Sequence, residues 1–251
     1  MYEFALIGHP VKHSQSPLFF TEKFEKEAVA ATYFVKDMPS LETLQDFLSQ
    51  HPRLVGFNVT SPHKQTLLPY LDHLSKEASE VGAVNTVLLH RDTKKLILSG
   101  YNTDIEGFRQ SLLPQLKQHH KKALILGTGG AAKAVACGLK KLHIDFLYVS
   151  RNAREGLLTY GEINRKMLEE FTLLINATPV GMGQLQALYP PIPYEDLTKQ
   201  HLCYDLIYAP SATLFLKRAA QQGAQVKNGL EMLHLQAEES WKIWKKELSN
   251  A

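Results

Sequence analysis

Short apolar runs alternate with amphipathic segments along roughly the first hundred residues of the chain. The runs that predict strands are residues 4–7, 33–35 and 55–59, and the segments with helical spacing are residues 17–28 and 41–49. This order predicts a β-α-β-α-β arrangement, in which strands joined through helices pair in parallel. Two further strand-like runs, 83–89 and 95–98, flank polar residues and predict an antiparallel hairpin at the edge of that sheet. The first half is therefore expected to form a mostly parallel α/β sheet with an antiparallel edge.

The same alternation of predicted strands and helices begins again after the polar stretch at residues 115–122. Further strands are expected at residues 123–126, 146–149, 173–176 and 202–206, with a helix at residues 213–222. This second series predicts a doubly wound parallel sheet of the Rossmann type. The last segment, 230–248, carries its apolar residues on one helical stripe and predicts a long terminal helix.

Composition, charge and cysteine content narrow the class of protein. A chain of 251 residues with 44% hydrophobic and 21% charged residues can bury the cores of two globular domains. The formal net charge is only +3 and the basic residues are scattered, which argues against nucleic acid as a partner. No leader-like segment opens the chain and no apolar run approaches the ~18 residues of a membrane span, so a soluble cytoplasmic protein is expected. Cys137 and Cys203 are far apart, so neither a disulfide scaffold nor a metal site is expected.

A glycine-rich turn joins a predicted strand to a predicted helix at residues 123–132. Gly127, Gly129 and Ala132 have the G-x-G-x-x-A spacing of dinucleotide-binding turns. Glycines let the backbone approach a pyrophosphate closely, and the helix N-terminus offers it unpaired N–H groups. A glycine turn without a ligand is the alternative, but strand, turn, helix and second strand follow in the required order. We therefore expect a dinucleotide here.

The end of the next predicted strand indicates which dinucleotide is bound. An acidic residue there would bind the ribose 2′-hydroxyl of NAD, whereas an arginine would accommodate the 2′-phosphate of NADP. The sequence has Arg151 and Arg154 at this place and no acid before Glu155. The alternative is that both arginines are merely exposed surface residues. NADP is the expected cofactor.

Four polar clusters follow or flank predicted strands in the first half of the chain. They are residues 13–16, 58–60, 85–86 and 102–104. Ligands of open α/β sheets bind outside the carboxyl ends of the strands, so these clusters are expected to converge on one crevice. Their hydroxyl and amide groups, together with Lys64 and Asp104, suit a small, polyhydroxylated, acidic ligand. Taken singly, each cluster could instead cap a helix or bond to loop backbone.

Lys64 stands out within the segment NVTSPHK at residues 58–64. Thr60 or Ser61 followed by Pro62 predicts a helix start with a hydroxyl N-cap and proline at the first helical position. Lys64 then falls in the first turn, where the positive end of the helix dipole opposes an ammonium group. A lysine there is expected to serve chemistry rather than helix stability.

The order and spacing of several motifs resemble the shikimate dehydrogenase family over essentially the whole chain. The motifs occupy residues 8–17, 58–64, 82–86, 100–104, 127–131, 176–178 and 229–233. The resemblance implies reversible, NADPH-dependent reduction of 3-dehydroshikimate to shikimate, a step of the shikimate pathway toward chorismate and the aromatic amino acids. It also implies a mostly parallel α/β substrate-binding domain at residues 1–104, a Rossmann-type NADP-binding domain at 105–228, and a terminal helix at 229–251 that packs back on the substrate domain.

The resemblance further implies roles for individual residues. Lys64 and Asp104 would be catalytic, with Lys64 exchanging a proton with the substrate oxygen and Asp104 orienting it; the alternative is a surface ion pair. The residues implied in substrate binding are Ser14, Ser16, Thr60, Lys64, Asn85, Asp104, Tyr208 and Gln236. Those implied in cofactor binding are Gly127, Thr128, Gly129, Gly130, Ala131, Ser150, Arg151, Asn152, Arg154, Thr178, Ile207 and Gly229. Gln236 otherwise has the pattern of an ordinary exposed helix residue.

Two departures from the family pattern bear on these expectations. Residues 150–152 read Ser-Arg-Asn where the family usually has Asn-Arg-Thr, which concerns cofactor preference and not the fold. His9 stands where asparagine is common. One alternative is a quinate/shikimate dehydrogenase with relaxed cofactor use, and another is a sensor that binds shikimate or NADPH without turnover. Partners beyond the small-molecule substrate are not expected, and both a monomer and a homodimer stay open.

Overall fold

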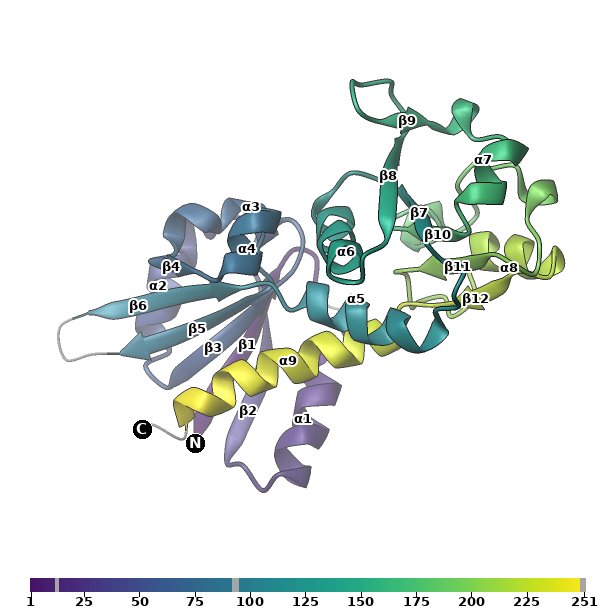
Figure 1. Cartoon of the computed structure of the whole chain (residues 1–251). Coiled ribbons are helices and arrows are strands. Elements are labelled where there is room, and N and C mark those ends of the chain that lie inside the picture. The colour runs from purple at the N-terminus through teal and green to yellow at the C-terminus, as the bar shows by residue number, and fades with distance from the viewer. Residues whose placement is uncertain (12–13, 92–94, 249–251) are drawn as a thin grey trace. The chain divides into compact units, whose positions relative to one another are not determined.

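Two compact units make up the chain in the computed structural model, which describes residues 1–11, 14–91 and 95–248. Unit 1 comprises Met1–Thr103 with Gln236–Ala251, and unit 2 comprises Asp104–Leu235. In Figure 1 the colour runs from purple to yellow along the chain, and the yellow C-terminal helix can be followed back to the purple strands of unit 1. His13 of the first polar cluster and residues 92–94 of the predicted hairpin turn lie outside the described residues.

Unit 1 is built on a mixed sheet whose described strands run in the order β2-β1-β3-β5-β6-β4. The strands are β1 (Tyr2–Gly8), β2 (Ala31–Asp37), β3 (Leu54–Val59), β4 (His73–Leu74), β5 (Thr86–Arg91) and β6 (Leu96–Tyr101). The helices are α1 (Ser16–Lys26), α2 (Leu44–Gln50), α3 (His63–Thr66) and α4 (Lys76–Val81), with 3-10 turns η1 (Leu41–Thr43) and η2 (Leu68–Tyr70). β1 pairs in parallel with β2 and β3, while β5 pairs antiparallel with β3 and β6. The predicted parallel start and the antiparallel hairpin are confirmed.

The hairpin differs from its prediction in two respects. β5 begins at Thr86 and not at residue 83, because the preceding residues still close the end of α4. The N–H groups of Gly82 and Ala83 both donate to the Ala78 carbonyl, and Gly82 has a φ of 66°. The hairpin also does not form the edge of the sheet, since β4 pairs in parallel with β6 beyond it. β4 has two residues, both exposed, and a strand that short shows no alternation in the sequence.

Unit 2 contains a sheet whose described strands run in the order β12-β11-β10-β7-β8-β9, all paired in parallel. The strands are β7 (Lys122–Leu126), β8 (Asp145–Ser150), β9 (Leu158–Thr159), β10 (Leu173–Asn176), β11 (Leu202–Asp205) and β12 (Gln225–Lys227). The helices are α5 (Asp104–Leu112), α6 (Gly130–Lys141), α7 (Arg165–Glu170) and α8 (Leu214–Gln221), with 3-10 turns η3 (Leu113–Gln115), η4 (Tyr160–Glu162), η5 (Gly183–Leu185) and η6 (Tyr194–Asp196). Helix α9 (Leu230–Leu248) begins in unit 2 and ends in unit 1. The strand order reverses at β7, as the Rossmann type requires.

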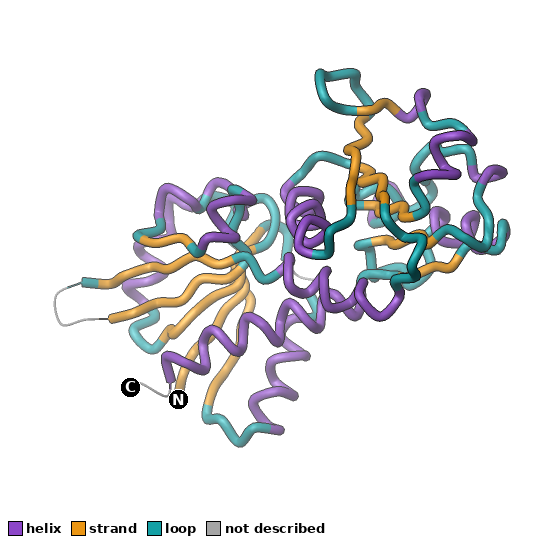
Figure 2. Tube along the Cα trace, viewed as in Figure 1, coloured by secondary structure: helices purple, strands orange, loops and turns teal. Residues whose placement is uncertain are grey.

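Both faces of the unit 2 sheet are buried, which is typical of parallel sheets with continuous apolar strands. In β10, Leu173 and Ile175 pack into one core with Phe108 of α5, whereas Leu174 packs into another with Phe215 of α8. Successive strand residues point to opposite faces, so these two cores lie on the two sides of the sheet. Figure 2 shows the helices flanking the strands in this unit. The predicted doubly wound arrangement is confirmed.

The C-terminal part of α9 completes the core of unit 1. Trp241 and Trp244 are buried and pack against Phe4, with ring centroids 5.9 and 4.8 Å away. Trp244 can lie this close to β3 because residue 56 is glycine, and a Cβ at Gly56 would collide with the indole nitrogen. That nitrogen donates a hydrogen bond to the carbonyl of Val87 in β5 at 2.9 Å. The predicted terminal helix and its apolar stripe are confirmed.

At 19 residues, α9 is long enough to be compared with a membrane span. It carries charged side chains along its length, among them Glu238, Glu239 and Lys242. Across the described ranges, neither α9 nor any other helix combines the length and the apolar character that crossing a membrane requires.

Candidate active site

The ends of strands β3, β5 and β6 in unit 1 bring predicted substrate residues together around Asn85. The Asn85 backbone carbonyl accepts a hydrogen bond from Val59 N at 2.8 Å, and its side-chain oxygen accepts one from Thr103 N at 2.8 Å. Its side-chain NH₂ group donates to Thr103 Oγ1 at 2.9 Å and to Gln236 Oε1 at 3.2 Å. Asn85 and Gln236, 151 residues apart in the chain, are therefore neighbours in the fold.

Ser14 and Ser16 lie together where α1 begins. Their hydroxyl oxygens are 3.2 Å apart, and the Ser14 hydroxyl also accepts the Ser16 N–H at 3.2 Å. Gln15 is the N-cap residue of α1, and its side chain makes no capping hydrogen bond. The buried Tyr33 hydroxyl donates to Asn58 Oδ1 at 2.8 Å, which joins β2 to the polar residues at the end of β3.

The predicted hydroxyl cap before Lys64 is wrong. Helix α3 is a single turn, its N-cap is Pro62, and no side chain caps it. Thr60 closes a turn instead, because its backbone carbonyl accepts the His63 N–H at 3.0 Å. A single turn contains few aligned peptide groups, so the helix dipole is a weak influence on Lys64.

Two contacts hold the short helix that carries Lys64. The Val84 N–H donates to the Lys64 carbonyl at 2.7 Å. The buried His63 hydrogen-bonds through Nε2 to the Met38 carbonyl, just after β2. The backbone of Lys64 is therefore tied to the loop before β5 on one side and to the loop after β2 on the other.

Thr60 and Asp104 occupy tight positions. Thr60 packs against Gly8, where a Cβ would collide with the Thr60 methyl group, so glycine is required at that point. Asp104 is buried and begins α5, directly after Thr103 in the chain. Asp104 is the first residue of unit 2, whereas Lys64 belongs to unit 1.

The predicted dinucleotide turn has the backbone geometry that a phosphate requires. Gly127 follows β7 with a φ of 111°, a region in which glycine is favoured, and a Cβ there would lie 3.0 Å from a neighbouring side chain. Gly129 is the N-cap of α6 and has no side chain to cap it, while Thr128 beside it is exposed. The first turn of α6, which includes Gly130 and Ala131, contains no acid. The N–H groups at the start of α6 are therefore not capped by a side chain, and no carboxylate in that turn would repel an anion. Both features suit the binding of a pyrophosphate.

The segment after β8 presents two exposed arginines. Ser150 ends β8, and its hydroxyl accepts the Asn152 N–H at 3.3 Å. Arg151 and Arg154 are both exposed, and within the described ranges neither forms an ion pair. Gly156, with a φ of 74°, lets the chain fold back next to Arg154. No acid stands at the end of the strand, so the guanidinium groups can receive an anion.

A buried carboxylate organises the loop after β11. Asp205, which is 0% exposed, accepts hydrogen bonds from Ile207 N at 3.0 Å and Thr213 Oγ1 at 2.6 Å. Asn176 Nδ2 donates to the same carboxylate at 3.1 Å, and Asn176 Oδ1 accepts the Thr178 hydroxyl at 2.6 Å. Thr178 and Ile207, both predicted cofactor residues, are thereby tied to one polar cluster.

Gly229 closes the same loop. Its N–H donates to the Ile207 carbonyl at 3.1 Å, and a Cβ on it would collide with the Leu206 carbonyl oxygen. Any other residue would force the two backbone segments apart. Tyr208, which follows Ile207, is half-buried, and this burial raises the pKa of its hydroxyl.

Asp205 is expected to make the stability of unit 2 depend on pH. Burial raises the pKa of Asp205 from its ordinary value of 3.8 to about 6, against the opposing effect of its three hydrogen bonds. The folded state therefore binds this proton more tightly than the unfolded state, and the stabilisation present at low pH is lost as pH rises from about 4 to about 6. Asp205→Asn, which has no charge to bury, should gain about 2 kcal/mol of unfolding free energy relative to the wild type between pH 4.5 and pH 7.5. Urea unfolding of both proteins across this range checks it, and parallel pH profiles would contradict it.

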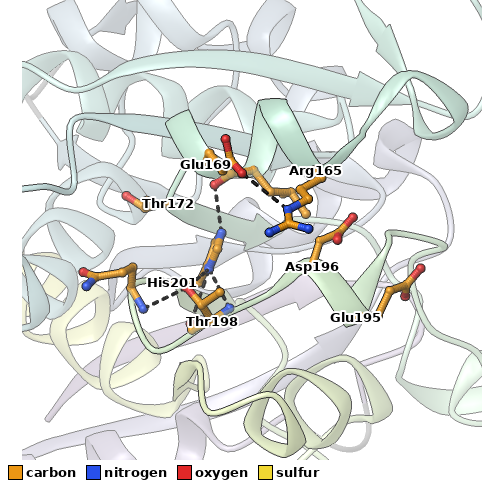
Figure 3. Close-up of a pocket in the computed structure, with 9 residues that line it drawn as sticks. Arg165, Glu169, Thr172, Glu195, Asp196, Thr198 and His201 are labelled. Atoms are coloured by element: carbon orange, nitrogen blue, oxygen red, sulfur yellow. Dashed lines mark hydrogen bonds and ion pairs between the residues drawn. The ribbon is translucent and has the colours of Figure 1, made fainter.

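A cavity of about 310 Å³ in unit 2 is shown in Figure 3. It is lined by Arg165, Leu168, Glu169, Thr172, Glu195, Asp196, Thr198, Gln200 and His201. Thr172 precedes β10 and His201 precedes β11, so the cavity lies at the amino ends of these strands. His201 is fully bonded there, because Nδ1 accepts Thr198 N–H and Nε2 donates to Leu168 O, both at 2.9 Å. Ligands of such sheets bind at the opposite, carboxyl ends, where the glycine turn is found.

The sequence alone did not point to Tyr33, His63 or Ser240, although the structure places Tyr33 and Ser240 in hydrogen bonds to Asn58 and places His63 in a bond to the Met38 carbonyl. Tyr33 falls within a predicted strand and His63 within a polar segment, so neither carries a local signal. Ser240 carries a weak one. It falls between Ala237 and Trp244 on the apolar stripe of α9, where a hydroxyl is out of pattern.

Comparisons with known proteins agree with this geometry. Residues 6–87 match the family described as the shikimate dehydrogenase substrate binding domain. A curated relative, the shikimate dehydrogenase (NADP(+)) of Caldanaerobacter subterraneus subsp. tengcongensis, is 39% identical and aligns over 96% of this chain and 90% of its own. The crystal structure of shikimate 5-dehydrogenase from Thermus thermophilus, in complex with NADP(H) and shikimate, is 34% identical with a TM-score of 0.84, covering 97% of this chain and 93% of that one. Shikimate 5-dehydrogenase from Listeria monocytogenes, in complex with shikimate and NAD, is 28% identical with a TM-score of 0.83, covering 98% and 92%. The chain therefore belongs to the shikimate dehydrogenase family.

Proposed function

We propose that the chain is an NADP-dependent shikimate dehydrogenase. It catalyses the reversible reduction of 3-dehydroshikimate to shikimate with NADPH, an oxidoreductase reaction at a CH–OH group. The reaction belongs to the shikimate pathway, which leads to chorismate and the aromatic amino acids. The observation that carries this proposal is the match of 96% of the chain to a shikimate dehydrogenase (NADP(+)). The polar groups of both units supply the chemistry that such a reaction needs.

We place the substrate on unit 1. The Ser14–Ser16 pair presents two hydroxyls 3.2 Å apart, which suits the two oxygens of the substrate carboxylate. The Asn85 and Gln236 amides, 3.2 Å apart, offer donors and acceptors to ring hydroxyls. The residues proposed to contact the substrate are Ser14, Ser16, Thr60, Lys64, Asn85, Asp104, Tyr208 and Gln236.

Lys64 and Asp104 carry the proton chemistry in this proposal. NADPH, when bound, supplies the hydride. Reduction of a ketone leaves negative charge on its oxygen, which needs a proton donor, and oxidation of the alcohol needs a base. The Lys64 ammonium group donates the proton in reduction, and its neutral amine accepts it in oxidation. Asp104 orients Lys64 and accepts a hydrogen bond from a substrate hydroxyl.

We place NADP on unit 2. The φ of 111° at Gly127 and the uncapped start of α6 let backbone N–H groups approach the pyrophosphate. Arg151 and Arg154 are proposed to bind the 2′-phosphate, because they are exposed and no acid takes the place that would select NAD. The other proposed cofactor residues are Thr128, Gly129, Gly130, Ala131, Ser150, Asn152, Thr178, Ile207 and Gly229.

Arg151→Ala is expected to raise the KM for NADP by about 10- to 100-fold and to leave the KM for NAD nearly unchanged. A hydrogen bond to a charged group contributes about 1.5–3 kcal/mol, and each 1.4 kcal/mol is a factor of ten. The matched control is Arg165→Ala, which removes an arginine of the same unit whose side chain is 79% exposed and pairs with Glu169. Steady-state kinetics with both cofactors decides the point, because equal changes in the two KM values would exclude recognition of the 2′-phosphate by Arg151.

The reaction itself is tested by the near-ultraviolet absorbance of reduced nicotinamide. Purified protein is mixed in parallel with shikimate or quinate, each with NADP or NAD. A rapid signal with shikimate and NADP alone supports the proposal. A comparable signal with quinate or NAD would assign the chain to a broader quinate/shikimate activity, and silence in all four mixtures would indicate a binding protein without turnover.

We further propose that the enzyme acts in the cytoplasm, on small molecules alone, as a monomer or a homodimer. Among the described residues, neither Cys137 nor Cys203 belongs to a disulfide, which fits a reducing compartment. Light scattering on the purified chain of 28.3 kDa distinguishes the two assembly states.

A further inference from the structure

A network of hydrogen bonds in unit 1 joins Tyr33 to the terminal helix. This relay consists of Tyr33, Asn58, Asn85, Thr86, Ser240 and Gln236. It contains two groups that the proposed function uses, the Asn85 and Gln236 amides. Tyr33 and Ser240 also belong to it, and the proposed function leaves them without a role.

The direction of the hydrogen bonds in the relay is fixed at Asn58. Asn58 Nδ2 lies 3.1 Å from the backbone oxygen of Asn85, which can only accept, so the amide must turn its NH₂ group to that side. Its Oδ1 therefore faces the Tyr33 hydroxyl at 2.8 Å, and Tyr33 must donate its single proton. Tyr33 thus holds the Asn58 amide in the orientation in which its NH₂ group donates to the Asn85 carbonyl.

Ser240 closes the relay on the helix side. Its side chain is 0% exposed, and its Oγ lies 3.0 Å from Asn58 Nδ2, 2.7 Å from Thr86 Oγ1 and 3.0 Å from the Gln236 carbonyl oxygen. Burying a hydroxyl costs free energy unless it is hydrogen-bonded, so packing alone does not account for a serine on this apolar stripe. What the hydroxyl adds is a direct bond between the helix turn that carries Gln236 and the strands that carry Asn58 and Thr86.

We propose that Tyr33 and Ser240 are positioning residues for substrate recognition. Tyr33 fixes the amide of Asn58, which bonds the Asn85 carbonyl, and Ser240 joins Asn58 to the helix turn of Gln236. The two amides proposed to bind the substrate hydroxyls therefore keep one spacing. Neither Tyr33 nor Ser240 touches the substrate in this account. The inference rests on the proposed function, because it takes Asn85 and Gln236 as substrate contacts.

The test compares Ser240→Ala and Tyr33→Phe with two controls of the same chemistry. Each test variant is expected to raise the KM for shikimate about five- to tenfold and to change the KM for NADP less than about twofold, the size expected for one lost hydrogen bond. The controls are Ser111→Ala and Tyr204→Phe, which break an equally buried serine–tyrosine hydrogen bond of 2.6 Å in unit 2. They should lower stability similarly and leave the KM for shikimate unchanged. A shared loss of stability alone therefore cannot produce the expected pattern.

The double variant Tyr33→Phe/Ser240→Ala tests whether the two residues act through one relay. Because both act through Asn58, the double variant should raise the KM for shikimate no more than about the larger single effect. Effects that multiply, or a KM in Ser240→Ala equal to that in Ser111→Ala, would overturn the proposal. If Ser240→Ala does not fold, Tyr33→Phe decides alone, since it keeps the ring that stacks on Phe20. Absence of shikimate turnover in the wild type would instead overturn the proposed function.

Discussion

Lys64→Ala is expected to lower kcat for shikimate oxidation by about 10²- to 10⁴-fold, the range that a positioned general acid or base contributes. Alanine has no group to accept the proton, so the proton would pass to water. The KM for NADP is expected to stay within about twofold of the wild-type value, because Lys64 is not among the residues proposed to bind the cofactor. Initial rates in both directions, together with a binding titration of NADP, measure the two quantities separately.

Two further variants show whether this loss belongs to proton transfer. Lys76→Ala removes an exposed lysine from the start of α4 in the same unit and should be close to wild type. Lys64→Asn keeps a hydrogen-bonding group but cannot exchange a proton near neutral pH, so it should be nearly as inactive as Lys64→Ala. Near-normal turnover in either Lys64 variant would remove Lys64 from the mechanism.

Trp244→Ala is expected to lower the free energy of unfolding by about 3–5 kcal/mol, the range for deleting a fully buried large side chain. The indole packs against the rings of Phe4 and Phe20, with centroids 4.8 and 5.3 Å away. Its N–H is also the donor to the Val87 carbonyl, which would lose this bond. Urea unfolding followed by circular dichroism measures the loss. A change below about 1 kcal/mol would mean that α9 is not held by this side chain.

Gly56 tests the same contact from the strand side. A Cβ there would collide with the indole of Trp244 and lie 2.7 Å from the Val87 carbonyl oxygen. Gly56→Ala is therefore expected to cost about 1–3 kcal/mol in the wild-type background. In the Trp244→Ala background the cost should fall, because the closest obstacle is gone. Equal costs in both backgrounds would show that the two residues do not meet in solution.

The helices and strands could largely be predicted because their signals are local. The strands of unit 2 coincide with continuous apolar runs in the sequence. α9 coincides with apolar residues that recur every three to four positions, which is the spacing of one helical face. The strand β4 was missed because a distant partner decides it: β4 is a strand because β6 lies beside it. The predicted hydroxyl cap of α3 failed for a local reason, because Thr60 bonds His63 through its backbone carbonyl.

The candidate site divides in the same way. The turn at Gly127 was predictable because glycine at a positive φ, a strand before it and a helix after it are all coded within ten residues. The contact between Asn85 and Gln236 was not, because it spans 151 residues and an amide on an exposed-looking helix position has no distinguishing pattern. Gln236 was named from family resemblance alone.

The sequence by itself determined the order of the elements, the dinucleotide turn, the exposed arginines after β8 and the presence of Lys64 and Asp104. Each of these depends on residues close together in the chain or on residue type alone. Only the tertiary structure decided that α9 packs against β3 and β5 through Trp244, and that Asn58 and Ser240 join Tyr33 to the helix turn of Gln236. Hydrogen bonds between distant residues depend on where the folded backbone places each side chain, and no periodicity in the sequence records that placement.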